Sequence, residues 1–346
     1  MDAPIDLRSD TVTRPSPGMR RAMAEAEVGD DVMGEDPTIN RLEAMCAELY
    51  GMDEALFVAS GTMANQVSVK AWTHPGDELI CDVNAHVFNY EGAGIAGLSG
   101  VQVNGVVAPR GIMTPQQVEQ RVRPGNVHYG PTRLVCTEIT HNRGGGSIYP
   151  IATVRGIADV CRRHGLRHHL DGARLLNACV VTGLAPTAYT EHADSATLCF
   201  SKSLGAPVGS IIAGPAEFID RCRRWRKMVG GGMRQAGILA AAAIYALEHN
   251  VERLAEDHEH AQILARGLAE INTLDFDPDE VETNMVFFDC PRTGLSGAQL
   301  VERMAEAGVL MLATAPNRIR LVAHLDVTRE QVVAAVAAFK RVLMTV

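Results

Sequence analysis

The sequence has no apolar run long enough to cross a membrane. No window approaches the ~18 to 20 uninterrupted apolar residues of a membrane-spanning helix. The N-terminal stretch MDAPIDLRSDTVTRP carries acids and prolines where a secretory signal has its apolar region. These absences argue against membrane and secreted classes and predict a cytoplasmic protein.

Motifs for metal binding and for disulfides are also missing. The eight cysteines include no CxxC pair, and several lie inside apolar runs such as LVCTEI and ATLCFS. The histidines of RRHGLRHHLD and of HEH at 258–260 have no third ligand at the spacing of a zinc site. We therefore expect cysteines that fill the core and no metal site.

Basic residues are not in excess. The formal net charge is −9 at pH 7, which argues against general nucleic-acid binding. One local basic run, RCRRWRK at 221–227, needs an explanation of its own. Internal repeats and low-complexity tracts are absent as well, so repeat architectures are excluded.

The residues that are present form an α/β pattern. Short apolar runs such as ALFVAS, LVCTEI and GSIIAG alternate with longer helical patterns. In the helix predicted after Pro150, Val154 and Ile157 fall on one face, as a helix covering a sheet requires. This alternation predicts a large, mostly parallel sheet. From about residue 235 an alanine-rich helix and mixed elements follow, which predicts a smaller α+β C-terminal domain.

The stretch GAGIAG at 92–97 has the glycine spacing of a dinucleotide-binding turn. Such a turn needs an apolar strand directly before it and an acid about 20 positions later for the ribose hydroxyls. The preceding segment NAHVFNYE carries Asn89 and Glu91, and the following window has no acid before Glu119. A glycine-lined helix start close to a ligand is therefore favoured over a nicotinamide or flavin site.

Three short stretches place reactive side chains at the ends of predicted strands. SGTMAN at 60–65 follows ALFV and opens a helix, so its amides and Thr62 could hold an anion. HLDGAR places Asp171 at the carboxyl edge of the sheet, where ligands of α/β proteins bind. FSKSLGAP places Lys202 at another strand end. Taken singly, the first two fit a helix cap and the third fits an exposed lysine.

Together these stretches supply the parts that a pyridoxal phosphate enzyme needs. A lysine forms the Schiff base, a carboxylate keeps the pyridine nitrogen protonated, and a helix N-terminus takes the phosphate. Asp171 and Lys202 are 31 residues apart, which allows them to come from neighbouring strands of one sheet. The combination therefore predicts pyridoxal 5'-phosphate as the cofactor.

Seven motifs, in order, extend this prediction to a family. They are IDLRSDTVTRPS, VGDDVMGEDPTINRLE, FVASGTMANQ, HLDGARLLNA, SKSLGAP, GGGMRQAGILAAA and RLVAHLDVT. In these motifs the chain resembles the threonine aldolase group of the fold-type I, aspartate-aminotransferase-like enzymes. The resemblance implies that fold and a homotetramer built from dimers, with active sites at the dimer interface. It also implies an N-terminal arm at 1–28 that contributes to the site and the small domain, a large cofactor-binding domain at 29–248 and a small C-terminal domain at 249–346.

The resemblance assigns roles around the cofactor residue by residue. Lys202 corresponds to the Schiff-base lysine, Asp171 to the partner of the pyridine nitrogen, and His86 to the residue that stacks on the ring. The other expected cofactor ligands are Gly61, Thr62, Arg174 and Ser201 and, from the neighbouring subunit, Lys227 and Arg234. The basic run near residue 225 then becomes an interface feature.

The resemblance also assigns roles around the substrate. The residues expected to hold its carboxylate are Ser9, Arg174 and Arg320, and arginine suits this role because its guanidinium donates two parallel hydrogen bonds. His86 and His128 are expected to reach the β-hydroxyl. The chain departs from the family at Met33 in DDVMGED, where an aromatic residue, often tyrosine, is common, and this departure bears on the shape of the pocket.

The activity implied is that of a carbon–carbon lyase. L-Threonine or L-allo-threonine is expected to be cleaved reversibly to glycine and acetaldehyde, with Lys202, Asp171 and the two histidines as catalytic residues. The nearest alternative is another pyridoxal phosphate lyase acting on β-substituted amino acids, such as a phenylserine aldolase or a β-eliminating enzyme. A catalytically silent scaffold is a second alternative. A nicotinamide oxidoreductase, supported by GAGIAG alone, is the third.

Overall fold

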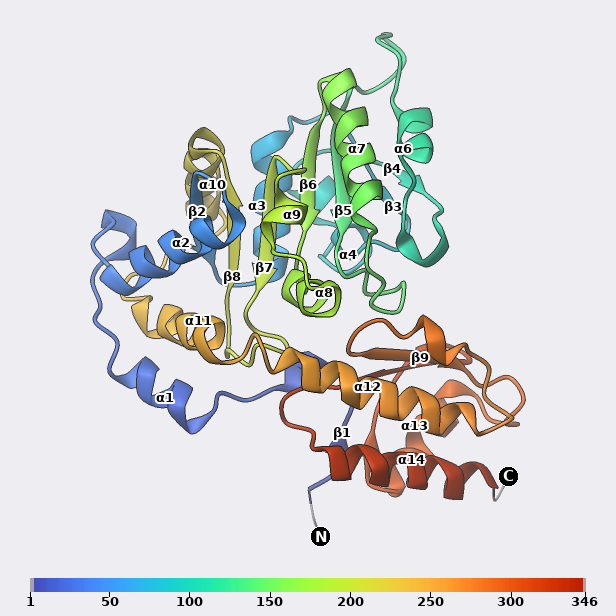
Figure 1. Ribbon diagram of the computed structural model, residues 1–346. Helices are drawn as coiled ribbons and strands as arrows, with labels where there is room; N and C mark the ends of the chain where they lie inside the picture. Colours follow the sequence, from blue (N-terminus) through green and yellow to red (C-terminus); the bar gives the residue numbers. More distant parts are fainter. Residues whose placement is uncertain (1–2, 345–346) are drawn as a thin grey trace.

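The computed structural model describes residues 3–344, which form a large and a small domain (Figure 1). A seven-stranded sheet with the order β2-β8-β7-β6-β5-β3-β4 lies at the centre of the large domain. Its strands are β2 (Glu54–Val58), β3 (Glu78–Asp82), β4 (Gln102–Val106), β5 (Thr132–Glu138), β6 (Arg167–Asp171), β7 (Ser195–Cys199) and β8 (Ser210–Gly214). Among these described strands β8 alone runs opposite to the other six, which confirms the predicted α/β class.

Helices cover both faces of this sheet because its strands direct apolar side chains into two cores. In β2, Leu56 and Val58 pack in one core and Phe57 packs in the other. The first core is covered by α3 (Gly61–Trp72) and α10 (Ala216–Met228). The second is covered by α2 (Pro37–Tyr50), α7 (Ile151–His164), α8 (Leu175–Thr182) and α11 (Gly237–His249). Strands buried on both faces are continuous apolar runs, which explains why the sequence reveals them.

The helix predicted after Pro150 is α7. Its Val154 and Ile157 are fully buried against the sheet. The helix ends where Gly165 adopts a φ of 63°, a left-handed conformation that glycine takes without steric cost. The chain then turns directly into β6, so the amphipathic pattern is confirmed as a sheet-covering helix.

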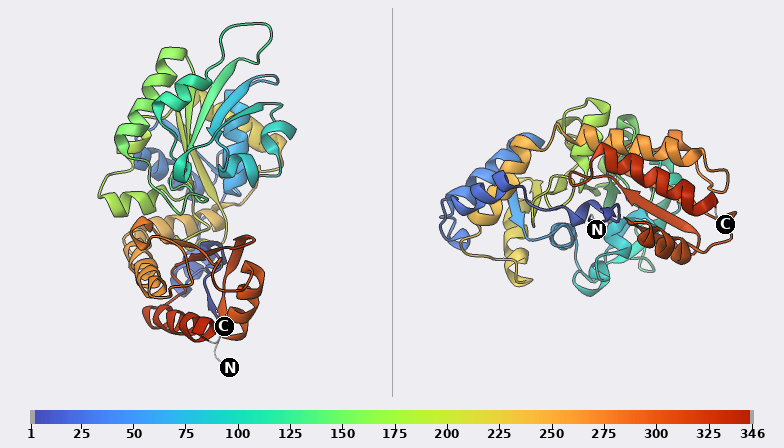
Figure 2. Two further views of the ribbon diagram at one scale, coloured as in Figure 1. Left: turned by 90° about the vertical axis from the view of Figure 1, so that its right-hand side faces the viewer. Right: turned by 90° about the horizontal axis from the view of Figure 1, so that it is seen from below.

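The small domain combines the C-terminal part of the chain with the N-terminal arm (Figure 2). An antiparallel sheet of β11 (Leu312–Ala315), β12 (Arg318–Val322) and β9 (Met285–Asp289) packs with α12 (Leu254–Ala269), α13 (Gly297–Glu306) and α14 (Arg329–Met344). Strand β1 (Ile5–Asp6) pairs with β10 (Val309–Leu310), so the arm begins in the small domain. These elements confirm the predicted α+β character of the C-terminal part.

Short helices complete the described residues. They are η1 (Asp10–Val12), α1 (Pro17–Ala24), η2 (Asp31–Met33), α4 (His86–Asn89), α5 (Gly94–Gly97), η3 (Pro109–Gly111), α6 (Pro115–Arg121), α9 (Thr187–Thr190) and η4 (Pro278–Glu280). The segment before GAGIAG forms α4 and not a strand, so the dinucleotide fingerprint lacks its strand. Across residues 3–344, every helix is too short or too polar to span a bilayer.

The carboxyl ends of the parallel strands face the small domain (Figure 1). Strands β3, β5 and β6 end at Asp82, Glu138 and Asp171, and Lys202 lies three residues beyond the end of β7. Polar side chains from several strands therefore meet at one edge of the sheet, where α/β proteins bind their ligands.

Candidate active site

Asp171 is buried at the carboxyl edge of the sheet. Its Oδ2 accepts a hydrogen bond of 2.8 Å from the side-chain amide of Asn65, and its Oδ1 accepts one of 3.1 Å from the backbone N–H of Ala173. Burial opposes ionisation, but the charges of His86 and Lys202 and these hydrogen bonds outweigh it, so the pKa of Asp171 lies below its usual value. The site therefore holds an anionic carboxylate at neutral pH.

His86 begins α4 and is held by a buried carboxylate. Its Nδ1 lies 2.8 Å from Oε1 of Glu91. Asn65 donates to the same oxygen at 2.8 Å and so connects Glu91 with Asp171, while Gln66 donates to Oε2 at 2.6 Å. Burial lowers the pKa of His86, but Glu91 and Asp171 raise it by more, so the net shift is upward. With Nδ1 engaged by Glu91, Nε2 is the nitrogen left for a reacting group.

The ligand atoms of His86, Glu91 and Asp171 lie within 4.8 Å of one another. This spacing is compatible with a cation. The hydrogen bonds from Asn65 and the contact between His86 and Glu91 already engage the same atoms, however. The spacing by itself therefore does not indicate a metal centre.

Lys202 lies on the loop that follows β7. Strands β6 and β7 are neighbours in the sheet, so Asp171 and Lys202 come from adjacent strand ends. The hydroxyl of Thr13 donates to the Lys202 carbonyl at 2.9 Å, which ties the loop to the N-terminal arm. The Lys202 side chain and its neighbour Ser201 are half-buried. An amine thus stands beside the carboxylate at the sheet edge.

The amino terminus of α3 packs against the end of β7. Ser60 caps this helix through its hydroxyl. A Cβ atom on Gly61 would lie 2.5 Å from Sγ of Cys199, so only glycine allows this close approach. The first-turn amides, those of Gly61 and Thr62, have no partner within a helix and are therefore donors that an anion can use.

Arg174 is buried and is fixed by the N-terminal arm. Its Nε and Nη2 donate to Oδ2 and Oδ1 of Asp10 at 2.6 and 2.7 Å, a bidentate pair. Burial disfavours both charges, but the pairing outweighs it, so the pKa of Asp10 is held well below its usual range and that of Arg174 is raised. Ser203 and Asn284 also donate to Asp10, at 3.3 and 3.4 Å. Asp10 therefore sets the position of Arg174.

Arg320 extends from β12 of the small domain to the large domain. Its Nη1 donates to Oδ1 of Asn142 at 3.0 Å, and its Nη2 donates to the carbonyl of Arg8 at 3.2 Å. Its Nε is buried and has no hydrogen-bond partner among the described residues. A buried donor without a partner is costly, and a carboxylate bound here would satisfy it. Ser9 follows Arg8 directly and caps η1, so its hydroxyl lies at the same junction.

Comparison with known proteins places this geometry in a family. The family model described as β-eliminating lyase matches residues 6–291. The chain is 41% identical over 346 residues to low-specificity L-threonine aldolase 1 of Arabidopsis thaliana, covering 99% of this chain and 97% of that protein. It is 42% identical over 341 residues to the low specificity L-threonine aldolase of Escherichia coli K12, covering 98% and 99%. The chain belongs to the β-eliminating lyase family, in its threonine aldolase group.

Solved structures share the fold of this lyase. A threonine aldolase from Leishmania major superposes with a TM-score of 0.84 at 20% identity, covering 98% of this chain and all of that one (100%). A serine palmitoyltransferase from Sphingomonas wittichii superposes with a TM-score of 0.77 at 18% identity, covering 99% and 88%. At such identities the likeness concerns the fold, and it confirms the predicted fold-type I class.

In this lyase His128 lies far from the other predicted site residues of its own chain. It is exposed on the loop before β5, whereas Asp171 and Lys202 lie at the carboxyl ends of their strands. The seven residues of β5 span roughly 20 Å at a strand rise of ~3.3 Å per residue. A role for His128 at such a site therefore requires a second copy of the chain.

Lys227 and Arg234 are also exposed, near the end of α10. Arg234 donates to both carboxylate oxygens of Asp30, at 3.2 and 2.9 Å. Asp30 caps η2, the turn that carries Met33, and the Met33 side chain is 69% exposed. Within one chain these two basic residues face solvent, and their expected contacts with a cofactor phosphate of a neighbouring subunit stay predictions.

Three residues of the site are not apparent from the sequence: Asp10, Asn65 and Glu91. In the sequence analysis, Glu91 serves only as evidence that the segment before GAGIAG is too polar to be a buried strand. The structure explains its presence, because it is buried as the partner of His86. A buried acid needs a partner, so an acid directly before a glycine turn is the signal that could have identified it. Asp10 offers no such signal, because Arg174 is 164 residues away.

Proposed function

We propose that this protein cleaves L-threonine and L-allo-threonine reversibly to glycine and acetaldehyde, with pyridoxal 5'-phosphate as its cofactor. The observation that carries this proposal is the meeting of Lys202, the anionic Asp171 and the amino terminus of α3 at one sheet edge. The 41–42% identity to low-specificity L-threonine aldolases supports the substrate class.

The residues at this edge fit the cofactor part by part. Asp171 suits a protonated pyridine nitrogen, and the first amides of α3, which have no partner within the helix, suit a phosphate. Lys202 supplies the amine for covalent attachment, with Ser201 beside it. When bound, pyridoxal phosphate supplies an electron sink for the electron pair of the breaking bond.

The substrate carboxylate fits between Arg320 and the N-terminal arm. The unpartnered Nε of Arg320 is a donor, and Ser9, which follows the Arg8 carbonyl that Arg320 contacts, adds a hydroxyl from the arm. Arg174, fixed by Asp10, contributes a second positive charge at this edge of the sheet. Contacts of this kind orient the Cα–Cβ bond of the substrate, and orientation decides which bond breaks.

His86 takes the proton of the β-hydroxyl at Nε2, directly or through a water. Glu91 holds Nδ1 and so fixes the orientation of the ring. Although burial lowers it, the pKa of His86 is raised overall by Glu91 and Asp171, which makes the imidazole a stronger base. As the Cα–Cβ bond opens, the aldehyde leaves and glycine remains. His128, delivered by a neighbouring subunit, is proposed as the second histidine.

We propose that the enzyme is a homotetramer, a dimer of dimers with shared sites. Large exposed apolar side chains occur on the segments expected at the interface: Val28, Val32, Met33, Met228, Val229 and Ile238. A hollow of about 270 Å³ beside α3, lined in part by Met63, Trp225 and Met228, adds to this surface. A second copy seated here removes apolar area from water and brings Lys227 and Arg234 toward a neighbouring site.

Two further expectations remain proposals. Limited proteolysis tests the domain boundaries near residues 28 and 248, because exposed linkers are cleaved first. Cell fractionation tests the cytoplasmic location and the expected lack of membrane and nucleic-acid partners.

Borohydride reduction followed by peptide mapping tests the proposed function. A yellow protein whose visible band bleaches and leaves pyridoxyl on Lys202 supports the cofactor and its lysine. A protein that stays colourless after incubation with pyridoxal phosphate refutes both.

Lys202→Ala is expected to abolish aldehyde release, whereas Lys340→Ala, which changes an exposed lysine paired with Glu270, serves as the control. Release of pyruvate and ammonia instead of acetaldehyde would favour the β-eliminating alternative, and cofactor binding without any turnover would favour the silent scaffold.

A further inference from the structure

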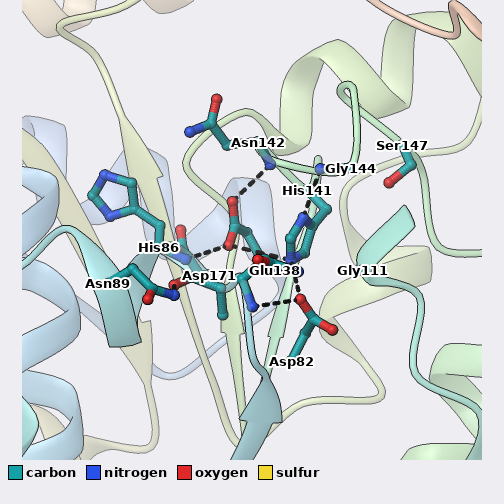
Figure 3. Close-up of polar contacts among 12 residues, drawn as sticks. Asp82, His86, Asn89, Gly111, Glu138, His141, Asn142, Gly144, Ser147 and Asp171 are labelled. Carbon is teal, nitrogen blue, oxygen red and sulfur yellow. Dashed lines mark hydrogen bonds and ion pairs between the residues drawn. The ribbon is translucent and has the colours of Figure 1, made fainter. Parts of the chain in front are cut away.

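One buried carboxylate holds two loops of the large domain at the site, and one of these loops contacts the small domain. Glu138 ends β5 and is paired in register with Asp171 on β6. Its Oε2 accepts the backbone N–H of His86 at 2.7 Å, and its Oε1 accepts the backbone N–H of Asn142 at 2.8 Å (Figure 3). The two oxygens of a single side chain therefore hold two separate loops.

Each of these loops carries a group that the proposed reaction uses. His86 supplies the imidazole, and its backbone amide is the atom that Glu138 holds. The side chain of Asn142 accepts a hydrogen bond of 3.0 Å from Nη1 of Arg320, the guanidinium of the small domain. Glu138 thus lies between the residue that receives a proton and the residue that holds the substrate carboxylate.

His141 packs behind Glu138 at the distance of an ion pair and not of a hydrogen bond. The Nδ1 of His141 accepts the backbone N–H of Gly144 at 3.0 Å, so its proton is on Nε2. Nε2 faces Oδ1 of Asp82 at 3.4 Å and Oε2 of Glu138 at 3.8 Å (Figure 3). A Cβ atom on Gly111 would lie 2.3 Å from the His141 ring, so the imidazole is closely packed. The carboxylate therefore has little freedom to move.

We propose that Glu138 is a positioning residue that sets His86 and Arg320 in register with each other. The inference rests on the proposed function, because it concerns the same reaction. The two groups come from different domains, and Glu138 is bonded to the loop of His86 and to the loop that contacts Arg320. A displacement of about 1 Å at either group is enough to slow a reaction on the order of 100-fold.

Glu138→Gln is the first test. Glutamine keeps one carbonyl acceptor but turns an NH2 group toward the other backbone N–H, so the two loops compete for one acceptor and both are held less firmly. We expect kcat/KM for threonine to fall on the order of 100-fold, with a higher KM through Arg320 and a lower kcat through His86. Affinity of the cofactor-free protein for pyridoxal phosphate, measured by absorbance titration, is expected to change less than about tenfold, because Asp171, Lys202 and α3 remain in place and only the predicted stacking contact of His86 is loosened. Glu119→Gln, an exposed glutamate paired with Arg163 and His164, is the control and should change neither value.

Asn142→Ala separates the two connections and does not alter the buried cluster. It removes the contact with Arg320 alone, so KM is expected to rise about tenfold with kcat nearly unchanged. In the double variant with Glu138→Gln, the rise in KM should be less than the product of the single effects, because both act through the same contact. An unchanged KM in Asn142→Ala, independent effects in the double variant, or a parallel loss of cofactor affinity and melting temperature in Glu138→Gln would overturn the proposal. Failure of the unaltered protein to release aldehyde would refute the proposed function instead.

Discussion

The buried ion pair between Asp10 and Arg174 gives a quantitative prediction for the N-terminal arm. The side chains are 0% and 6% exposed and share two hydrogen bonds, of 2.6 and 2.7 Å. Removing one partner of such a pair leaves a buried charge without compensation and costs about 3–5 kcal/mol. Asp10→Asn is therefore expected to lower the free energy of unfolding by about 3–5 kcal/mol.

Asp6→Asn is the matched control, because Asp6 lies in the same arm and pairs with Arg8. That pair is also short, at 2.6 Å, but its side chains are 24% and 45% exposed. Exposed pairs contribute about 1 kcal/mol or less, so the control variant should stay close to the unaltered protein. Urea unfolding of the holoenzyme, followed by far-UV circular dichroism and tryptophan fluorescence, measures both variants.

The pH dependence of the same experiment provides an independent check. Burial alone raises the pKa of Asp10, but the charge and hydrogen bonds of Arg174 hold it well below its usual range. A carboxyl with a depressed folded-state pKa stabilises the protein above its unfolded pKa of about 3.9 and loses that contribution as pH falls. The difference between the unaltered protein and Asp10→Asn should be full at neutral pH and shrink below about pH 4. Equal losses in Asp10→Asn and Asp6→Asn, or a difference that does not change with pH, would refute this reasoning.

Three further predictions concern catalysis. Asp171→Asn should retain bound cofactor yet lower kcat by about 100-fold or more, because the negative charge that keeps the pyridine nitrogen of the cofactor protonated is lost. Unchanged kinetics would show that a residue other than Asp171 interacts with this nitrogen. Glu91→Gln should lower the pKa of His86, so the acid limb of the pH–rate profile is expected to move to lower pH, and a fixed limb would remove His86 as the base. Lys202→Ala and His128→Ala, each inactive alone, should recover up to roughly a quarter of the activity when they are mixed and refolded together. About half of the refolded dimers then contain one copy of each variant, and in each of these dimers one of the two shared sites has both an intact Lys202 and an intact His128. No recovery would place His128 outside the neighbouring site.

The large domain is predictable because its strands are buried on both faces. The runs LVCTEI and GSIIAG contain the apolar cores LVC and IIA, and the structure places these cores in the middle of β5 and β8. The reversed direction of β8 is not predictable in the same way. The direction of β8 is set by the loop at 200–209, which turns the chain back so that β8 pairs antiparallel with β7. The hydrophobic periodicity of a strand does not indicate whether the strand runs parallel or antiparallel to its neighbour.

The candidate site is predictable only where a residue type has a local reason for its place. Lys202 follows the apolar run ATLCFS, and Asp171 directly precedes the turn residues Gly-Ala-Arg, so their position at strand ends can be inferred from the sequence alone. Asn65 lies inside a helical pattern, and its contact with Asp171 spans 106 residues. The position of His128 shows a different limit, because a family resemblance can assign a role to a residue without stating which subunit supplies it.

The resemblance extends along almost the whole chain for a physical reason. One edge of the sheet gathers buried acids that cannot stay charged unless cations lie beside them. The acids are Asp10, Asp82, Glu91, Glu138 and Asp171, and the basic groups among them are His86, His141, Arg174, Lys202 and Arg320. These groups come from the N-terminal arm, from four strand ends, from α4 and from the small domain. Because loss of one member of a pair such as Asp10–Arg174 or Glu91–His86 leaves an opposite charge unpaired, segments far apart in the chain constrain one another. The site's groups are therefore spread from residue 10 to residue 320.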